Sequence, residues 1–280
     1  MLLMYPQVKN FFRKIISKTF GVLGYLVGFK SGIISPTYIR RFGFAVLRPF
    51  AVLNILYGLG IVQSFSLGKG LYKDEPHGYF IKIEIAYKKH VRFGTGRDIF
   101  DFPKALWAAI GESIERWSLD NFDPAQDIII DSSYNALSQE KLDIFSVVGF
   151  SEELRKKKTH SFDLQFDTDT SFKWVRGTSL LSNSEVYIPL QMVSFKFLNK
   201  FVRQKKEPLL APPITTGAAA GKNITHALTS GLLEVIERDA FMIYWVNKLS
   251  PDIIAIDSIP DERFSRMKEI AKTYQLEVYL

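Results

Sequence analysis

The fold is decided by the stretch His226-Ala-Leu-Thr-Ser-Gly-Leu-Leu-Glu234-Val-Ile-Glu-Arg-Asp239-Ala-Phe-Met-Ile-Tyr-Trp-Val-Asn-Lys-Leu-Ser-Pro251. Its apolar residues recur at helical spacing, which predicts one long helix that Pro251 ends. A helix that is apolar nearly all round is expected to be buried. Charges are rarely buried without a partner, because their desolvation costs several kcal/mol per ion. The charged residues between Glu234 and Asp239 therefore predict that this helix faces a polar cleft, a metal or a charged ligand.

The same pattern occurs earlier in the chain. Residues 105–116 align without gaps on residues 227–238 at an offset of 122, and six of the twelve positions are identical. We expect a Gly-containing turn before each copy, at 94–96 and at 216–221, and we expect Asn223 to cap the second helix. The period is too long for a solenoid. The repeat therefore predicts two related helices that face one site, the first at about 101–119.

The charge is distributed unevenly along the 280 residues. Residues 1–73 hold ten basic side chains and no acidic one, whereas the other 207 residues hold 26 basic and 29 acidic. We therefore divide the chain into a basic N-terminal segment, 1–73, and a domain, 74–280, and we expect no nucleic-acid partner. The absence of cysteine excludes disulfides, thiolate metal sites and a cysteine nucleophile, and it fits a reducing, cytoplasmic compartment.

Two parts of the N-terminal segment have alternative interpretations. Residues 7–20 predict a basic amphipathic helix, which either lies on an anionic membrane, docks on a partner or packs on its own domain. Residues 49–68 carry no charge and have the length to span a bilayer. Their proline, glycines and polar residues favour a buried helix followed by a strand instead. Residues 7–68 are thus the candidate region for membrane contact.

The remaining elements follow from hydrophobic periodicity and turn residues. We expect strands at 80–87, 127–131, 172–180, 185–188 and 252–256, a strand beginning at 276, and helices at 139–145, 151–158 and 261–274. This mixture predicts an α/β (α+β) fold. A domain rarely ends on the opening of a buried strand, so we expect the chain to be cut before its fold is complete.

Four glutamates are the candidate metal ligands. Glu112 and Glu115 are three residues apart and share a helix face, and so do Glu234 and Glu237. Two such helices at one site gather four carboxylates, which repel one another strongly in a poorly solvated cleft. A divalent cation relieves that repulsion, and hard oxygen ligands select Mg²⁺ or Ca²⁺. Mg²⁺ also takes the phosphates of a substrate as ligands.

Two arginines are the candidate phosphate ligands of the same cleft. Arg116 and Arg238 close the two copies of the repeat, and the N–H groups at the helix starts add further donors. The alternative interpretation is a pair of solvated helix faces, on which each arginine pairs with the glutamate four residues before it. The chain contains no Walker motif.

These blocks resemble those of a known family. The pattern Gly-x-Gly, then Ala-Leu-x-x-x-x-Gly-Glu-x-x-Glu-Arg, occurs at 94–116. The pattern Thr-Gly-x-Ala-x-Gly, then Gly-Leu-Leu-Glu-x-Ile-Glu-Arg-Asp-Ala-Phe, follows at 216–241. They are similar to the two signature blocks of YcaO-domain proteins, over about residues 75–280, in the setting of the azole-forming cyclodehydratases.

The resemblance implies mixed sheets with helices and an ATP cleft between the two repeat-related helices. It implies ATP and Mg²⁺ as cofactors, the four glutamates as metal ligands and Arg238 as a phosphate contact. In the family, a Cys, Ser or Thr side chain of a ribosomally made peptide attacks the preceding amide carbonyl. ATP then phosphorylates the amide oxygen, which leaves as phosphate. The implied partners are the precursor peptide, a leader-peptide-binding protein and a second copy of the chain, and no catalytic side chain is named.

The sequence departs from the family pattern in two ways. His226 stands where the family often has a glutamate, and Lys222 stands where it has Asn or Gln, although Asn223 is adjacent. We expect Lys222 and Asn223 to contact the nucleotide. The family domain also continues well past residue 280. A second hypothesis, a non-catalytic scaffold that binds a leader peptide or a partner protein, therefore stands beside that of an enzyme.

Overall fold

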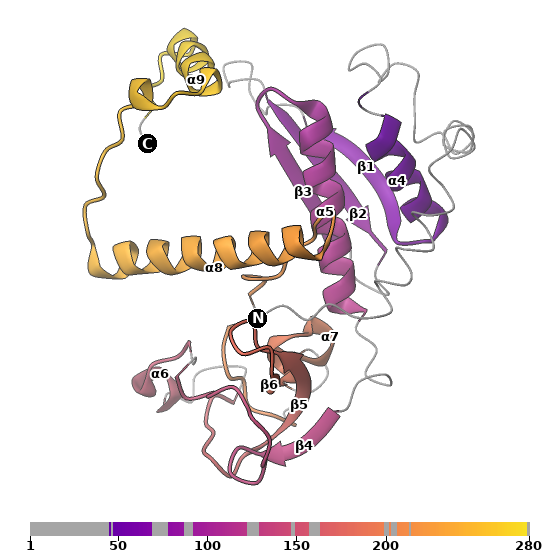
Figure 1. Ribbon diagram of the computed structural model, residues 1–280, viewed down its shortest axis with the longest axis vertical. Helices are drawn as coiled ribbons and strands as arrows, with labels where there is room; N and C mark the ends of the chain where they lie inside the picture. Colours follow the sequence, from indigo (N-terminus) through magenta and orange to yellow (C-terminus); the bar gives the residue numbers. More distant parts are fainter. Residues whose placement is uncertain are drawn as a thin grey trace. The chain divides into compact units, whose positions relative to one another are not determined.

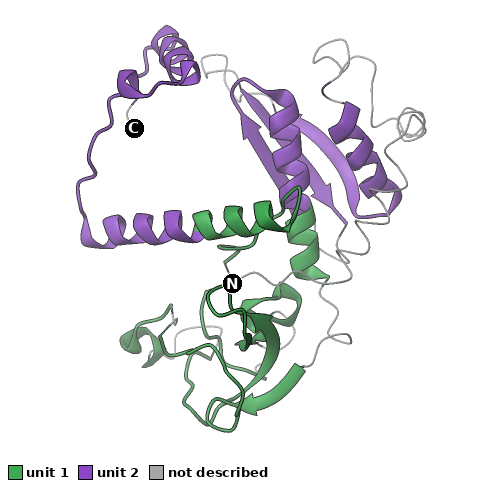
Figure 2. Ribbon diagram, viewed as in Figure 1, with its two compact units in different colours: residues 1–17, 114–234 green, residues 18–113, 235–280 purple. Residues whose placement is uncertain are grey.

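The structure is a computed structural model of the chain. It describes residues 45, 47–68, 78–86, 92–121, 129–146, 149–156, 163–198, 202, 206–212 and 214–278. These residues form two compact units, one containing 114–234 and the other containing 45–113 and 235–278 (Figure 2). The boundaries fall inside two helices, α5 (Phe102–Asp120) and α8 (Ile224–Asn247), so each helix contributes to both units.

One unit is built on an antiparallel sheet of β1 (Val62–Gly68), β2 (Tyr79–Ile85) and β3 (Arg92–Asp98), in that order (Figure 1). Isoleucines alternate along β2, and Ile81, Ile83 and Ile85 are buried. The helix α4 (Leu47–Gly58) and the first part of α5 complete this core with Phe50, Leu53, Leu56, Ala105, Leu106 and Ala109.

The uncharged segment 49–68 thus contains a helix with a buried side, followed by a strand, as the sequence favoured. None of the helices in the described ranges has both the length and the hydropathy needed to cross a membrane. The strand β1 pairs with β2 across the predicted boundary at residue 73, and the division at that point stays a prediction.

The first Gly-containing segment is not a turn. Residues 94–96 lie inside β3, and both glycines are buried. A Cβ atom on Gly94 would lie 2.7 Å from the carbonyl oxygen of Ala109, and one on Gly96 would lie 2.5 Å from the amide nitrogen of Ala109. Real Cβ atoms do not approach backbone so closely. The glycines are therefore required because α5 crosses directly over β3.

The other unit contains a second antiparallel sheet, of β4 (Ile129–Ser133), β5 (Ser171–Thr178) and β6 (Glu185–Pro189). The strands predicted at 172–180 and 185–188 are confirmed as β5 and β6, which pair as a hairpin. Asn183 at its turn has a φ of 57°, a conformation that asparagine tolerates better than most residues. One face packs around the fully buried Trp174, whose indole N–H donates to the carbonyl oxygen of Ser132 at 2.8 Å.

A buried polar network joins this sheet to the loop that leads into α8. The amide nitrogen of Gln191 donates to Oε2 of Glu207 at 3.2 Å and to the carbonyl oxygen of Pro208 at 3.0 Å. Its amide oxygen accepts from the backbone N–H of Leu210 at 3.0 Å. The backbone N–H of Lys173 on β5 donates to Oε1 of Glu207 at 3.0 Å. The network therefore satisfies buried polar groups on both the loop and the strand.

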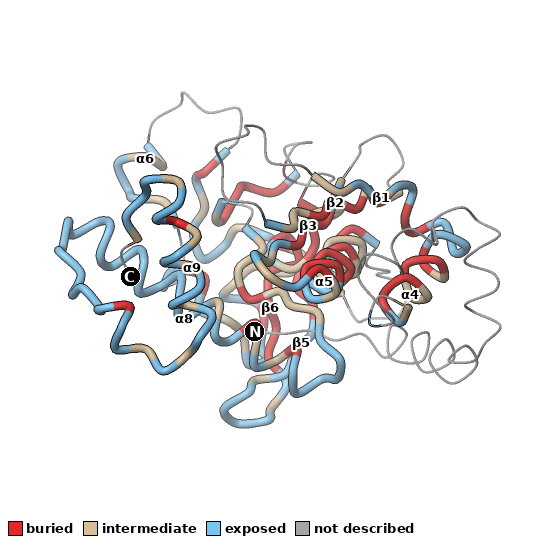
Figure 3. The backbone as a smooth tube through the Cα atoms, turned by 90° about the horizontal axis from the view of Figure 1, so that it is seen from above, coloured by how far each residue is buried: buried red, intermediate tan, exposed pale blue. Residues whose placement is uncertain are grey.

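The long helix α8 begins near the predicted position but is not buried as expected. Only Ala227 and Gly231 are buried, and nearly every residue from Leu232 onward is exposed, as Figure 3 shows. The prediction of burial was wrong for the described residues. An apolar helix is buried only where other elements pack on it, and no described element covers this part of α8. The helix ends at Asn247, before Pro251, with Lys248 at a φ of 53°.

Several shorter predictions have clear outcomes. The helix α9 (Glu262–Thr273) was predicted, and Asp261 caps it. The short helix α6 (Glu152–Lys156) lies within the predicted helix at 151–158. The predicted helix at 139–145 is instead a β-bridge followed by a turn, because Lys141 pairs with Tyr187 of β6.

The predicted strand at 252–256 is not a strand but a segment without regular secondary structure, which leads into the 3-10 turn η5 (Ile256–Ser258). A strand needs a neighbour for its hydrogen bonds, and none of the described strands pairs with this segment. Residues 276–278 are likewise not in a strand. The predicted helix at 7–20 lies outside the described residues.

Candidate nucleotide and metal site

The two repeat helices begin in the same way, which extends the repeat beyond its identical residues. Asp101 caps α5, because its Oδ1 accepts the backbone N–H of Lys104 at 2.9 Å. Asn223 caps α8, as predicted, because its Oδ1 accepts the backbone N–H of His226 at 2.8 Å. Both caps and both donors are 122 residues apart, the offset of the sequence repeat. The two helices are therefore related in their starting geometry as well as in sequence.

Glu112 has the best-defined environment among the predicted metal ligands. It lies on α5, half-buried, and its Oε2 accepts two hydrogen bonds from Thr95 on β3. The backbone N–H donates at 2.5 Å and the hydroxyl Oγ1 donates at 2.8 Å. Hydrogen bonds to an ionised carboxylate are short and strong. Thr95 therefore holds the carboxylate in a defined orientation.

The other predicted site residues differ in exposure. Glu115 and Arg116 on α5 and Glu234 on α8 are half-buried. Glu237, Arg238, Lys222 and Asn223 are exposed. Within the described ranges, no three carboxylate or imidazole side chains are grouped closely enough to hold a metal ion. The prediction that four glutamates face one site, with two arginines, Lys222 and Asn223 beside them, therefore stays a prediction.

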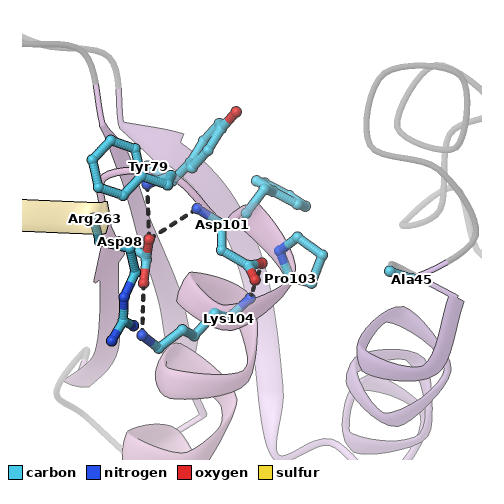
Figure 4. Close-up of a pocket in the computed structure, with 9 residues that line it drawn as sticks. Ala45, Tyr79, Asp98, Asp101, Pro103, Lys104 and Arg263 are labelled. Carbon is cyan, nitrogen blue, oxygen red and sulfur yellow. Dashed lines mark hydrogen bonds and ion pairs between the residues drawn. The ribbon is translucent and has the colours of Figure 1, made fainter. Parts of the chain in front are cut away.

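A pocket of about 500 Å³ lies at the start of α5 (Figure 4). Its charges are largely engaged with one another. Asp98 accepts the backbone N–H groups of Phe100 and Asp101, at 2.8 and 2.9 Å, and its carboxylate pairs with Nζ of Lys104 at 3.1 Å. Arg263 of α9 lies on the same side and pairs with Asp261. The pocket is thus a capped helix start whose described charges are balanced.

The environment of Asp98 lowers the pKa of its carboxyl group. Burial alone would raise that pKa, but the two backbone N–H donors and the ammonium group of Lys104 outweigh it. The net pKa lies below the ordinary value of 3.8. Asp98 is therefore ionised at neutral pH and fixes the turn between β3 and α5.

Sequence reasoning missed the roles of Thr95 and Asp98. The sequence pattern presents Thr95 only as the middle of a Gly-Thr-Gly turn, and its partner Glu112 is 17 residues away. The sequence offered one signal for Thr95, which is a hydroxyl residue placed between two glycines in the first block. Asp98 stands three residues before the N-cap Asp101, and that spacing of acidic residues at a helix start also pointed to it.

The residues present suit ATP and Mg²⁺ by their chemistry. The candidate ligands are all carboxylate oxygens, the donors that Mg²⁺ prefers, and Glu112 is oriented by its hydrogen bonds from Thr95. The small-residue loop before α8 also approaches the helix closely, because a Cβ atom on Gly221 would lie 2.5 Å from the amide nitrogen of Ala227. Gly221 is therefore required because the loop packs directly against the first turns of α8.

Comparison with known proteins places the chain in a family. A family model described as YcaO cyclodehydratase, ATP- and Mg²⁺-binding, matches residues 99–280. The chain therefore belongs to the YcaO family, and the resemblance of its two blocks is confirmed. ATP and Mg²⁺ are the ligands of that family, as expected. A search of curated proteins found no match.

Solved structures support the fold. A YcaO protein from Methanopyrus kandleri, bound with AMPPCP and Mg²⁺, matches with a TM-score of 0.54 at 17% identity. A heterocyclase in complex with substrate and cofactor matches with a TM-score of 0.62 at 16% identity, and the heterocyclase TruD with 0.53 at 18%. The matches cover 81%, 79% and 63% of this chain. The predicted mixed α/β fold is therefore confirmed.

The chain spans only part of the length of these structures. It covers 51% of the Methanopyrus kandleri protein, 31% of the heterocyclase complex and 27% of TruD. At such identities the likeness concerns the fold alone.

Proposed function

We propose that this chain is the nucleotide-binding part of an ATP- and Mg²⁺-dependent cyclodehydratase that forms azolines from Cys, Ser or Thr in a ribosomally made peptide. The observation that carries the proposal is the first repeat helix, in which Glu112 is held by Thr95 of β3. Glu112 lies within the region that matches the YcaO family, and Thr95 lies just before that region.

Each candidate residue has a role in this proposal. Glu112, Glu115, Glu234 and Glu237 would hold Mg²⁺, which when bound would neutralise negative charge on the triphosphate. Arg116, Arg238, Lys222 and Asn223 contact phosphate oxygens. The peptide supplies the nucleophile, so the chain needs no nucleophile of its own. Its task is to orient ATP against the peptide and to stabilise the charge that develops during phosphoryl transfer.

The reaction proceeds in two stages within the peptide. The thiol or hydroxyl loses its proton as it adds to the preceding amide carbonyl, and the resulting oxyanion takes the γ-phosphoryl group of ATP, releasing ADP. The C–O bond then breaks with loss of phosphate, and the amide nitrogen gives up its proton as the C=N bond forms. We expect a precursor peptide and a leader-peptide-binding protein as partners. A homodimer, a cytoplasmic location and membrane contact through residues 7–68 stay predictions.

The proposal is tested by nucleotide binding to the full chain. We expect calorimetry with AMPPCP to detect binding that requires Mg²⁺. Glu112→Gln and Glu234→Gln should each weaken that binding by about tenfold or more, since each removes a charged metal ligand. Glu152→Gln on α6 is the control and should bind like the wild type, because Glu152 pairs only with Lys156 among the described contacts.

Binding by both site variants that equals the wild type would contradict the proposed metal site. Circular dichroism should be unchanged in all variants, so that a loss of binding is not a loss of fold.

A scaffold role is the second candidate function. His226 and Lys222 stand where the family pattern has a metal ligand and an amide, and both are exposed at the start of α8. A scaffold would bind a leader peptide or a partner protein equally well with and without Mg²⁺ and nucleotide. Peptide binding measured under both conditions separates the two roles, because an enzyme couples peptide binding to the nucleotide.

A further inference from the structure

At the outer edge of the first sheet, Thr95 is hydrogen-bonded to Glu112 of α5. β3 is at the edge of the sheet β1-β2-β3, and Thr95 lies in its centre, opposite Lys82 of β2. A backbone N–H that points away from a sheet needs an acceptor other than a neighbouring strand. The carboxylate of Glu112 is that acceptor, at 2.5 Å. The hydroxyl of Thr95 then donates to the same oxygen at 2.8 Å.

The two glycines beside Thr95 make this contact possible. Gly94 and Gly96 are buried under α5, and any side chain on them would collide with the backbone of Ala109. Without that close approach, Glu112 could not reach the amide of Thr95. The Gly-Thr-Gly segment therefore has two roles. Its glycines allow α5 to pack closely on β3, and its threonine hydrogen-bonds to Glu112.

Two donors on one oxygen restrict a side chain that is otherwise flexible. A glutamate has three rotatable bonds, and ordering it costs conformational entropy when a ligand binds. A carboxylate that is already ordered avoids that cost at the moment of binding. Groups that hydrogen-bond to a metal ligand in this way orient it and raise metal affinity.

The second repeat has no hydroxyl at the position that corresponds to Thr95. Residue 95 corresponds to residue 217 at the offset of 122, and residue 217 is a glycine with a φ of 87°. A glycine has no hydroxyl to offer Glu234. The hydroxyl at this position is therefore present only in the first repeat. Its removal should affect Glu112 and not Glu234.

We propose that Thr95 is a positioning residue, whose hydroxyl holds Glu112 in the orientation in which Glu112 binds the metal of a metal–nucleotide complex. This inference rests on the proposed function, in which Glu112 is a metal ligand. The role is distinct from a direct contact, because Thr95 acts through the carboxylate that it holds.

The experiment measures the affinity of the full chain for AMPPCP at a series of Mg²⁺ concentrations. Thr95→Val removes the hydroxyl, keeps the β-branched shape and leaves the backbone N–H in place. We expect it to raise the Mg²⁺ concentration at half-maximal binding about tenfold. Thr95→Ser restores a hydroxyl and should stay within about threefold of the wild type. Thr178→Val, at an exposed position of β5, is the matched control and should have no effect.

The outcomes separate the inference from the function on which it rests. If Glu112→Gln loses binding while Thr95→Val binds like the wild type, the positioning role is wrong and the metal role stands. If Glu112→Gln itself binds like the wild type, the metal role fails and the positioning role fails with it. A loss in Thr95→Val that Thr95→Ser does not restore, or that comes with a lower melting temperature, would indicate a structural role and overturn the inference.

Discussion

At the scale of single residues, the short distance between β3 and α5 depends on two glycines of β3. Gly94 and Gly96 have no side chain, so the helix rests on the strand backbone and Glu112 reaches Thr95. Asp98 and Asp101 then fix the turn and the start of the helix through backbone N–H groups. The position of one candidate ligand is thus set by a few neighbouring residues on one short segment.

We predict that Gly96→Ala destabilises the protein. Its Cβ atom would collide with backbone atoms of Ala105 and Ala109, which cannot rotate away as a side chain would. Overpacking of this kind costs about 3 kcal/mol when the neighbours are rigid. Urea denaturation of the full chain measures the change.

Gly58→Ala is the matched control for this substitution. Gly58 ends α4, and no atom lies within 4 Å of the place that a Cβ atom would occupy there. The same change at Gly58 should therefore shift the free energy of unfolding by no more than about 1 kcal/mol. Equal effects of the two substitutions would show that the contact between α5 and β3 is not tight.

At the scale of elements, the loop before α8 is attached to the second sheet by buried polar groups. Glu207 is 7% exposed and Gln191 is 5% exposed, and both are hydrogen-bonded to the loop or to β5. Burial raises the pKa of Glu207 above the ordinary value of 4.5, although the N–H of Lys173 and the amide of Gln191 act in the opposite direction. The carboxylate form is therefore disfavoured in the folded state.

This shift predicts a pH dependence of stability. A carboxyl group whose pKa is raised on folding binds its proton more tightly in the folded state than in the unfolded state. Its contribution is most favourable below the unfolded value of about 4.5 and is lost as the pH rises through the folded pKa. The glutamine in Glu207→Gln cannot ionise, so this variant should not lose stability from this position as the pH rises.

Urea denaturation between pH 4 and pH 8 checks this expectation. The free energy of unfolding of Glu207→Gln minus that of the wild type should be larger at pH 8 than at pH 4, which means that the variant is relatively more stable at pH 8. Other carboxylates are common to both proteins, so their effects cancel in the difference. A difference that is constant over this range would mean that the pKa of Glu207 is not raised.

At the scale of the whole molecule, the described residues leave a large apolar surface on α8. Trp245 is 71% exposed, Val246 66% and Phe241 57%, and the rings of Phe241 and Trp245 stack at 5.9 Å. Contiguous apolar surfaces of this kind are rare on soluble monomers and favour association. Among the described residues, the second half of α8 therefore presents a surface that favours contact with another apolar surface.

We predict that Trp245→Ser and Phe241→Ser reduce the binding of an apolar dye such as ANS without unfolding the protein. Their side chains are exposed, so the free energy of unfolding should change by no more than about 0.5 kcal/mol. Leu106→Ala, at a fully buried position of α5, is the contrast and should cost about 2–5 kcal/mol. Dye fluorescence and urea denaturation give the two measurements. A large loss of stability in Trp245→Ser would show that this part of α8 is covered in solution.

The sequence by itself determined the elements whose signals are local. Helical periodicity, the N-cap at Asn223 and the repeat at an offset of 122 located α5 and α8, because side chains three and four residues apart form each helix face. Alternation located β2, and turn residues between two apolar segments located β5 and β6. The same blocks identified the family and named Glu112 as a candidate ligand.

Only the tertiary structure decided which segments pack together. It placed Gly94–Gly96 in a strand rather than a turn, left 252–256 without a partner among the described strands, and gave Glu112 its two donors on Thr95. These features depend on contacts between residues far apart in the chain. A local sequence pattern does not predict which distant segment will supply a hydrogen bond or a packing contact. The physical reason is that a hydrogen bond or a collision is decided by distance in space, whereas periodicity reports only neighbours along the chain.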